Sequence, residues 1–190
     1  NFMIKRICFF LLIFNFVFSQ NPCDIQDLEG FIYLNSFQGN NYYLSLQKDT
    51  WENANDICNT INQGHLVTIN SLEENDFLYN TIISFVPNNY WIGLSDVNNE
   101  SSFEWVTGEF LNYTNWNILE PNGGVNENYV EVYSLNSQWP SMWNDAPGYV
   151  ERYYVLEIEC FEADCSYINT LPSDTVICKG DTVELNLPVG

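Results

Sequence analysis

The chain has 190 residues, of which 25 are Asp or Glu and only five are Lys or Arg, giving a net charge of −20. Such an acidic chain repels nucleic acid and anionic membrane surfaces, so both are excluded as partners. Aromatic residues make up 16% of the sequence, which is enough to fill the core of one domain of about 140 residues.

The first 19 residues have the pattern of a secretory signal peptide. Lys5 and Arg6 precede an apolar run from Ile7 to Val17, small residues lie near Ser19, and Met3 is the expected start. The run is too short to span a bilayer, and no other segment approaches the necessary length. We therefore expect a secreted or surface-displayed protein. Its mature part has three basic residues against 25 acidic ones, a net charge of −22.

The mature chain opens with a predicted hairpin, which is followed by a helix. Residues 31–45 contain two apolar runs around a turn at Gly39–Asn41. Thr50 is expected to cap a helix from Trp51 to about Gln63, which Gly64 ends. The apolar residues of this helix recur at helical spacing: Ala54, Ile57, Cys58 and Ile61.

A short strand at His65–Ile69 leads into a second predicted helix. Ser71 and Glu74 form a capping box at its start, and the helix stops before Pro87. Its expected buried face consists of Leu72, Phe77, Leu78, Ile82 and Ile83. His65 is the single histidine of the chain and has no recognisable nucleophile beside it. We expect it to be structural, and we expect no enzyme activity.

After Tyr90 the helical period gives way to short apolar runs separated by loops rich in Asn and Gly. These runs read WIGL, FEWV, YVEVY and YYVLEIE. Such runs are typical of short strands. Two helices followed by strands and long loops predict an α+β fold.

The segment 116–145 gathers side chains with oxygen atoms and contains no His or Cys. Ca²⁺ binds about six to eight oxygens, whereas Zn²⁺ in proteins usually takes His or Cys. Five residues would supply such oxygens and leave room for about two more from a ligand: Glu120, Asn122, Glu127, Asn144 and Asp145. The alternative is that Pro121–Gly124 is an ordinary turn and the acids form a solvated face.

At Glu120-Pro121-Asn122 and Trp143-Asn144-Asp145 the sequence resembles the C-type lectin domain, in particular its mannose-type branch. From Gly30 to Cys160 the order of the predicted elements is also similar to the family, including GHLVTI, WIGL and WVTG. The resemblance implies a C-type lectin fold, with two helices, small antiparallel sheets and long calcium-binding loops. It further implies one Ca²⁺ held by the five residues above, a coordination shell completed by vicinal sugar hydroxyls, and a cis Glu120–Pro121 bond.

A second cation position is weaker in the sequence. Asp96 and Glu100 stand four residues apart after WIGL, as do acids that hold an auxiliary Ca²⁺ in members of the family. Here Gly123, which follows Asn122, has no side-chain oxygen, and Glu127 is followed by Asn128. These two departures argue against an auxiliary site.

The cysteines also depart from the family. Five remain in the expected mature chain: Cys23, Cys58, Cys160, Cys165 and Cys178. Cys58 matches the family's helix cysteine, but Leu156 stands where its partner is expected, and the short loop disulfide of the family is missing. Bridges from Cys160 to Cys23 or to Cys58 both stay open.

From Cys165 onward the sequence changes character, and TVICKGDTVELNL resembles the opening strands of an immunoglobulin-like repeat of bacterial surface proteins. We expect residues 23–160 to form the C-type lectin domain. Residues 161–190 are expected to be a linker and the truncated start of an immunoglobulin-like domain.

Together these patterns predict calcium-dependent binding of mannose-, N-acetylglucosamine- or fucose-like glycans by a secreted or cell-surface adhesion protein. Repeated domains or oligomers would make the binding multivalent. Two alternatives stay open because a fold does not determine a function. One is a protein- or ice-binding module on the same fold, and the other is the targeting domain of a larger extracellular enzyme.

Overall fold

The computed structural model describes residues 25, 27–160, 165–167 and 176–178. Within them the elements follow in the order β1 (Phe31–Phe37), β2 (Asn40–Ser45), α1 (Trp51–Asn59), β3 (Gly64–Leu66), α2 (Leu72–Ile82), β4 (Tyr90–Ser95), β5 (Glu104–Trp105), η1 (Gly124–Asn126), β6 (Tyr129–Val132), β7 (Trp143–Ala146), β8 (Tyr153–Ile158), β9 (Cys165–Tyr167) and β10 (Val176–Cys178). The predicted signal peptide, Cys23 and most of the predicted linker and immunoglobulin-like start lie outside the described residues. None of the described helices is long and apolar enough to cross a bilayer.

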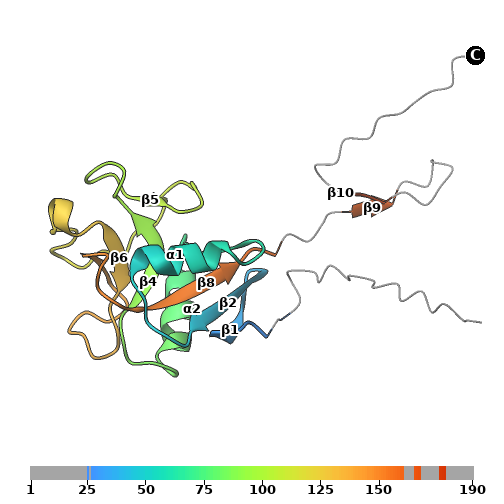
Figure 1. The fold of residues 1–190 in the computed structure, drawn as a ribbon, viewed down its shortest axis with the longest axis horizontal. Helices are drawn as coiled ribbons and strands as arrows, with labels where there is room; N and C mark the ends of the chain where they lie inside the picture. Colours follow the sequence, from blue (N-terminus) through green and yellow to red (C-terminus); the bar gives the residue numbers. More distant parts are fainter. Residues whose placement is uncertain (1–24, 26, 161–164, 168–175, 179–190) are drawn as a thin grey trace, which may run out of the picture.

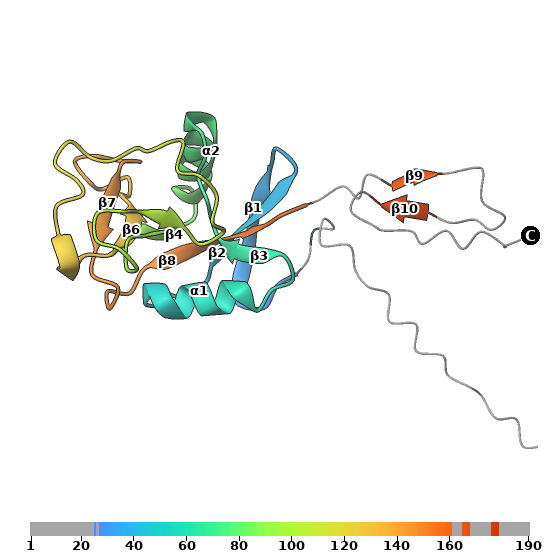
Figure 2. The same ribbon diagram turned by 90° about the horizontal axis from the view of Figure 1, so that it is seen from above.

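One mixed sheet organises the domain, with strand order β1-β2-β8-β4-β6-β7. β3 also pairs with β8, and β5 pairs with β4. β4 and β8 run parallel, while the other pairings in this sheet are antiparallel. The predicted α+β class is therefore confirmed, and β7 is a strand that the sequence patterns did not predict. The long connections around η1 lie at the end of the sheet away from the β1–β2 hairpin (Figures 1 and 2).

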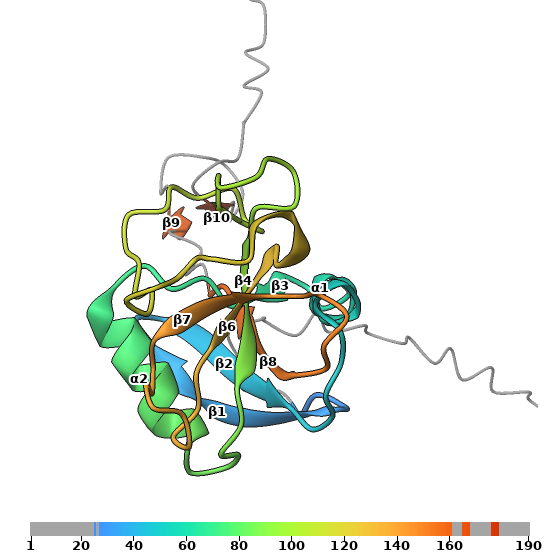
Figure 3. The same cartoon turned by 90° about the vertical axis from the view of Figure 1, so that its left-hand side faces the viewer.

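The two helices lie on opposite sides of strand β8 (Figures 2 and 3). Each covers its own hydrophobic cluster. Leu78 and Ile82 of α2 pack in one cluster with Ile92, Val130 and Trp143. In the second cluster, residues of α1 pack with Trp91, Tyr129 and Leu156: Trp51, Ala54 and Cys58. The sheet is thus buried on both faces, which keeps its strands rigid beneath the loops.

Helix α1 begins as predicted and ends earlier than predicted. The Thr50 side chain accepts a hydrogen bond from the backbone N–H of Asn53, which confirms the N-cap. The helix stops at Asn59, and Gln63 rather than glycine takes a positive φ, of 59°. Gly64 is needed for another reason, because a Cβ there would lie 2.9 Å from a side-chain carbon of Leu156.

Cys58 carries a buried free thiol, so the open alternative of a Cys58–Cys160 bridge is wrong for this structure. Cys58 packs in the same cluster as Leu156, the residue that stands at the expected partner position. Burial raises the pKa of the thiol, which keeps it in the neutral form. We conclude that Cys58 fills the core as a small apolar side chain.

Helix α2 differs from its predicted buried face. The Ser71 hydroxyl accepts from the backbone N–H of Glu74, as predicted, and Leu78 and Ile82 are buried. Leu72, however, is 53% exposed, whereas Glu74 and Asn75 are buried. Both polar side chains find partners inside. Glu74 accepts from the backbone N–H of Asn70, and Asn75 accepts from the Trp143 indole N–H at 2.9 Å.

A buried hydrogen-bonded cluster joins α2 to the sheet. The Tyr42 hydroxyl lies 2.7 Å from Glu74 Oε1 and 3.2 Å from Glu157 Oε1. Glu157, which is 2% exposed, also accepts from the Asn40 amide and from the backbone N–H of Thr68. His65 lies beside this cluster, with its Nε2 3.4 Å from Glu159 Oε1.

Burial raises the pKa of both Glu74 and Glu157. A raised native pKa means that the folded state holds the proton more tightly than the unfolded chain. The stability contributed by these carboxyls is therefore complete below about pH 4 and is lost as the pH rises through their native pKa. Donors such as the Tyr42 hydroxyl limit this loss, because they stabilise the ionised form.

We predict that Tyr42→Phe lowers the free energy of unfolding by about 1.5–3 kcal/mol at pH 7, the usual value of a hydrogen bond to a charged group. The penalty should shrink at pH 4, where the carboxyls are protonated. Urea unfolding at both pH values checks this. Tyr33→Phe is the matched control, because the Tyr33 hydroxyl bonds Ser36 at the surface. Equal penalties for the two variants at pH 7 would contradict the prediction.

Candidate functional site

Asp145 ties the loop that carries Glu120 to the sheet. Asp145 lies on β7, is 2% exposed, and faces the loop with both carboxylate oxygens. Its Oδ1 accepts from the backbone N–H of Asn122 at 3.0 Å, and its Oδ2 from that of Gly123 at 2.9 Å. The Glu120–Pro121 peptide bond is cis, as predicted. These contacts place Glu120-Pro121-Asn122 directly against Trp143-Asn144-Asp145.

Glu120 is half-buried, and its Oε2 atom has no hydrogen-bond partner. Burial raises the pKa of its carboxyl, and the charges of Asp145 and Glu127 raise it further. Burial also raises the pKa of Glu127, followed by the charges of Asp145 and Glu131. The three predicted acidic ligands are therefore close enough to repel one another, a situation that a bound cation relieves.

Glu127 packs over the glycine that follows Asn122. A Cβ on Gly123 would lie 2.1 Å from the Cβ of Glu127 and 2.2 Å from its Oε2. No other residue fits at position 123 without moving Glu127. The glycine that the sequence shows as lacking an oxygen ligand is thus what lets the Glu127 carboxylate approach the loop.

The remaining two predicted ligands are both asparagines. Asn122 is exposed, and its backbone is held by Asp145. Asn144 is half-buried on β7, and its side-chain N–H donates to Glu131 Oε1 at 3.2 Å. Sequence reasoning missed Glu131, although it stands in the YVEVY run, because an acid within an apolar strand was not assigned a partner.

Within the described ranges, no group of three or more His, Cys, Asp or Glu side chains stands ready to hold a metal. At Asp145, both carboxylate oxygens accept from backbone amides. The donor set nevertheless fits a hard cation. It consists of carboxylate and amide oxygens, it includes the unpartnered Glu120 Oε2, and its acids raise one another's pKa.

The second predicted cation position contains Asp96 and Glu100. Asp96 is 4% exposed, and its Oδ2 accepts from the backbone N–H of Ser101, whereas its Oδ1 has no partner. Its backbone N–H donates to the carbonyl of Asn128, whose side-chain Oδ1 is also buried without a partner. Glu100 Oε1 lies 3.7 Å from where a Cβ on Gly124 would stand. Asn128, which the sequence showed as a departure, is therefore joined to Asp96 through its backbone carbonyl.

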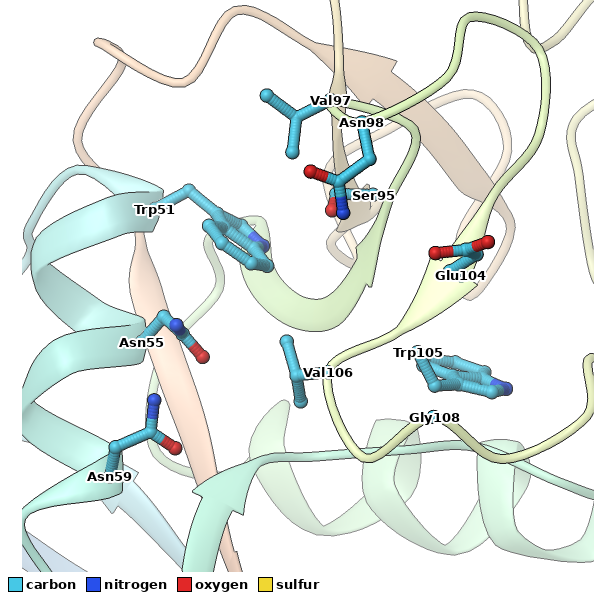
Figure 4. A pocket seen from close by; sticks show the side chains of 10 residues that line it. All are labelled: Trp51, Asn55, Asn59, Ser95, Val97, Asn98, Glu104, Trp105, Val106 and Gly108. Carbon is cyan, nitrogen blue, oxygen red and sulfur yellow. The ribbon is translucent and has the colours of Figure 1, made fainter.

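A separate pocket of about 390 Å³ lies between α1 and the β4–β5 segment (Figure 4). Asn55 and Asn59 extend from α1 toward it, the Trp51 ring stands at its edge, and Glu104 stands on the far side. His65 is not among its lining residues, so the pocket supplies no nucleophile–imidazole pair.

A family model described as the Lectin C-type domain matches residues 47–157. The mouse low affinity immunoglobulin epsilon Fc receptor is 39% identical over 72% of this chain and 40% of its own length. Chicken hepatic lectin is 34% identical over 72% of this chain and 61% of its own length. The chain thus spans less than two thirds of the length of each of these relatives, and their animal origin does not support the expected bacterial source.

Among solved structures, the cow C-type carbohydrate-recognition domain of CD23, studied in the presence of a GlcNAc2Man3 oligosaccharide, has a TM-score of 0.59. It is 33% identical and covers 72% of this chain and 98% of its own. This likeness confirms the predicted C-type lectin fold. Nothing in the comparisons supports the expected immunoglobulin-like repeat, of which the structure describes only the antiparallel pair β9–β10.

We predict that Glu127→Gln stabilises the protein at pH 7 in the presence of a chelator. The native pKa of Glu127 is raised, so its ionised form loses stability as the pH rises, and glutamine mimics the protonated form. The melting temperature should rise by about 1–3 °C at pH 7, and the difference should vanish at pH 4. Glu104→Gln, an exposed position on β5, is the control. A lower melting temperature for Glu127→Gln at pH 7 would contradict the prediction.

Proposed function

Because the chain belongs to the C-type lectin domain family, we propose that it binds carbohydrate in a calcium-dependent manner, with mannose-like glycans preferred. One observation carries this proposal: Glu120, Glu127 and Asp145 crowd around a loop that Asp145 itself holds in place. We further propose a secreted or cell-surface protein without enzyme activity, in keeping with relatives that are named as lectins and receptors.

The residues that would hold Ca²⁺ are Glu120, Asn122, Glu127, Asn144 and Asp145. When bound, Ca²⁺ would supply a positive charge that vicinal sugar hydroxyls can ligate directly. We propose no second ion at Asp96 and Glu100, because Gly123 offers no side-chain oxygen there. Loading the first site would require Asp145 to share or release a backbone amide, so metal binding and loop geometry would be coupled.

The chain's own side chains would read the sugar. Glu120 and Glu127 are acceptors when ionised, whereas the amides of Asn122 and Asn144 can donate. A hydroxyl placed between an acceptor and a donor can satisfy both, so the positions of these groups select hydroxyl orientation. Hydrogen bonds to ionised groups are among the stronger ones, which favours acids for this task.

Affinity at one such site should be weak, with a dissociation constant on the order of millimolar, because little surface is buried. Useful binding would then depend on several domains acting together. The cow CD23 domain was studied with an oligosaccharide, and hepatic lectin is named as a lectin. These names support glycans as the ligand class proposed here.

The test is a glycan array probed with multivalent protein, with and without Ca²⁺. We predict binding to mannose-type glycans that a chelator abolishes. Glycan binding that survives chelation would contradict calcium dependence. A partner whose binding survives both chelation and competition by free sugar would instead favour a protein- or ice-binding module on the same fold. The double variant Glu120→Gln with Asn122→Asp keeps size and total charge but exchanges which side accepts and which side donates. It should retain Ca²⁺, shown by a calcium-dependent rise in melting temperature.

The same variant should lose mannose binding, because each mismatched hydrogen bond costs about 1–3 kcal/mol, or roughly 5- to 150-fold in affinity. Glu109→Gln, at an exposed loop residue, serves as the array control and should bind like the native protein. If the double variant kept native mannose binding, Glu120 and Asn122 would not be the specificity pair.

A further inference from the structure

The side chain of Asn144 ends in an amide whose oxygen and nitrogen have opposite roles. As a calcium ligand it must present Oδ1, while its Nδ2 hydrogens are donors. Rotation by half a turn would present the nitrogen to the cation and abolish coordination. Whatever group faces the other end of the amide therefore decides whether Asn144 is a ligand.

Glu131 is that group. It stands directly opposite Asn144 in the β6–β7 pairing, and its Oε1 accepts from Asn144 Nδ2 at 3.2 Å. An ionised carboxylate can only accept, so it holds the Nδ2 end and turns Oδ1 the other way. Glu131 is 3% exposed, so water cannot easily take the place of this contact.

Arg152 holds Glu131 in turn. Its Nε–H donates to Glu131 Oε2, forming an ion pair in which the Glu131 side chain is almost fully buried. The guanidinium lies over the Trp91 ring, 5.9 Å from its centroid. The Arg152 backbone also exchanges two hydrogen bonds with Asp49. Arg152 is thus held at its backbone by Asp49 and at its guanidinium by the Trp91 ring.

The basic side chains among the described residues do not pair with the predicted acidic calcium ligands. Lys48 and Arg152 are the only Lys or Arg residues in the part of the chain that the structure describes. Lys48 lies over the Tyr153 ring. Arg152 pairs with Glu131, an acid outside the predicted ligand set, and forms no ion pair with Glu120, Glu127 or Asp145. This leaves those three carboxylates without a protein cation.

We propose that Glu131, held by Arg152, is a positioning residue that orients the Asn144 amide for calcium and hence for sugar. This inference rests on the proposed function. Partners that orient metal ligands in this way typically change metal affinity by about 10- to 100-fold when they are replaced. The contacts from Arg152 through Glu131 to Asn144 would therefore set the calcium affinity of the site, although Arg152 and Glu131 are not themselves calcium ligands.

Two variants test the inference by calorimetric titration with Ca²⁺. Glu131→Gln keeps the size of the side chain but can present either an oxygen or an N–H to Asn144, so the amide is no longer oriented. Arg152→Lys keeps the charge but lacks the Nε–H donor, and it carries the test if the first variant does not fold. We expect Ca²⁺ affinity to fall at least about 10-fold in Glu131→Gln and by less in Arg152→Lys.

A second readout needs no calcium. In the native protein under chelation, one Nδ2 proton of Asn144 should exchange slowly with solvent by NMR, because it is bonded to a buried carboxylate. That protection should be lost in Glu131→Gln. Glu151→Gln removes one exposed acid beside Arg152 and is the control for a simple change of charge, with native affinity and native protection expected.

Native Ca²⁺ affinity in both test variants, with the native protein binding Ca²⁺ normally, would overturn the positioning role and leave the proposed function standing. Failure of the native protein to bind Ca²⁺ would overturn both. An equal loss in Glu151→Gln would also overturn the inference, since charge alone would then explain the effect.

Discussion

The grip of Asp145 on two backbone amides is the contact on which the rest of the site depends. It joins a loop with a cis proline to strand β7, and it uses both oxygens of a buried carboxylate to do so. Glu120 and Glu127 are then left near that charge without a protein cation, and their pKa values are raised first by burial and then by the charge of Asp145. Asp145 therefore orders the loop through its hydrogen bonds, and its negative charge also repels the other two acids of the loop.

Trp143 shows how the fold supports this arrangement. Its ring is fully buried and packs edge-on against Trp105, Tyr113 and Trp116, while its N–H donates to Asn75 of α2. A large aromatic anchored in the core fixes the start of β7, so the next two residues are delivered to the loop at a defined position. In Trp143-Asn144-Asp145, Trp143 therefore positions the strand, and Asn144 and Asp145 are the predicted calcium ligands.

The sequence predicted those features of the fold that depend on contacts between residues close together in the chain. The hairpin, the caps at Thr50 and Ser71 and the α+β class follow from turn chemistry, capping and periodicity within a few residues. Buried polar groups could not be predicted in this way. The predicted buried face of α2 included Leu72 but neither Glu74 nor Asn75, because apolar patterning cannot anticipate partners such as Tyr42 or Trp143 far away in sequence. The Arg152–Glu131–Asn144 chain was missed for the same reason.

The most direct measurement of the central claim is a crystal structure of the protein with Ca²⁺ and a methyl mannoside, in which calcium is located by its anomalous signal. The account predicts one ion within coordination distance of oxygens from Glu120, Asn122, Glu127, Asn144 and Asp145, with two adjacent sugar hydroxyls completing its shell. Sugar bound elsewhere, for example in the pocket between α1 and β5, with Asp145 still holding both amides and no ion beside it, would contradict the account.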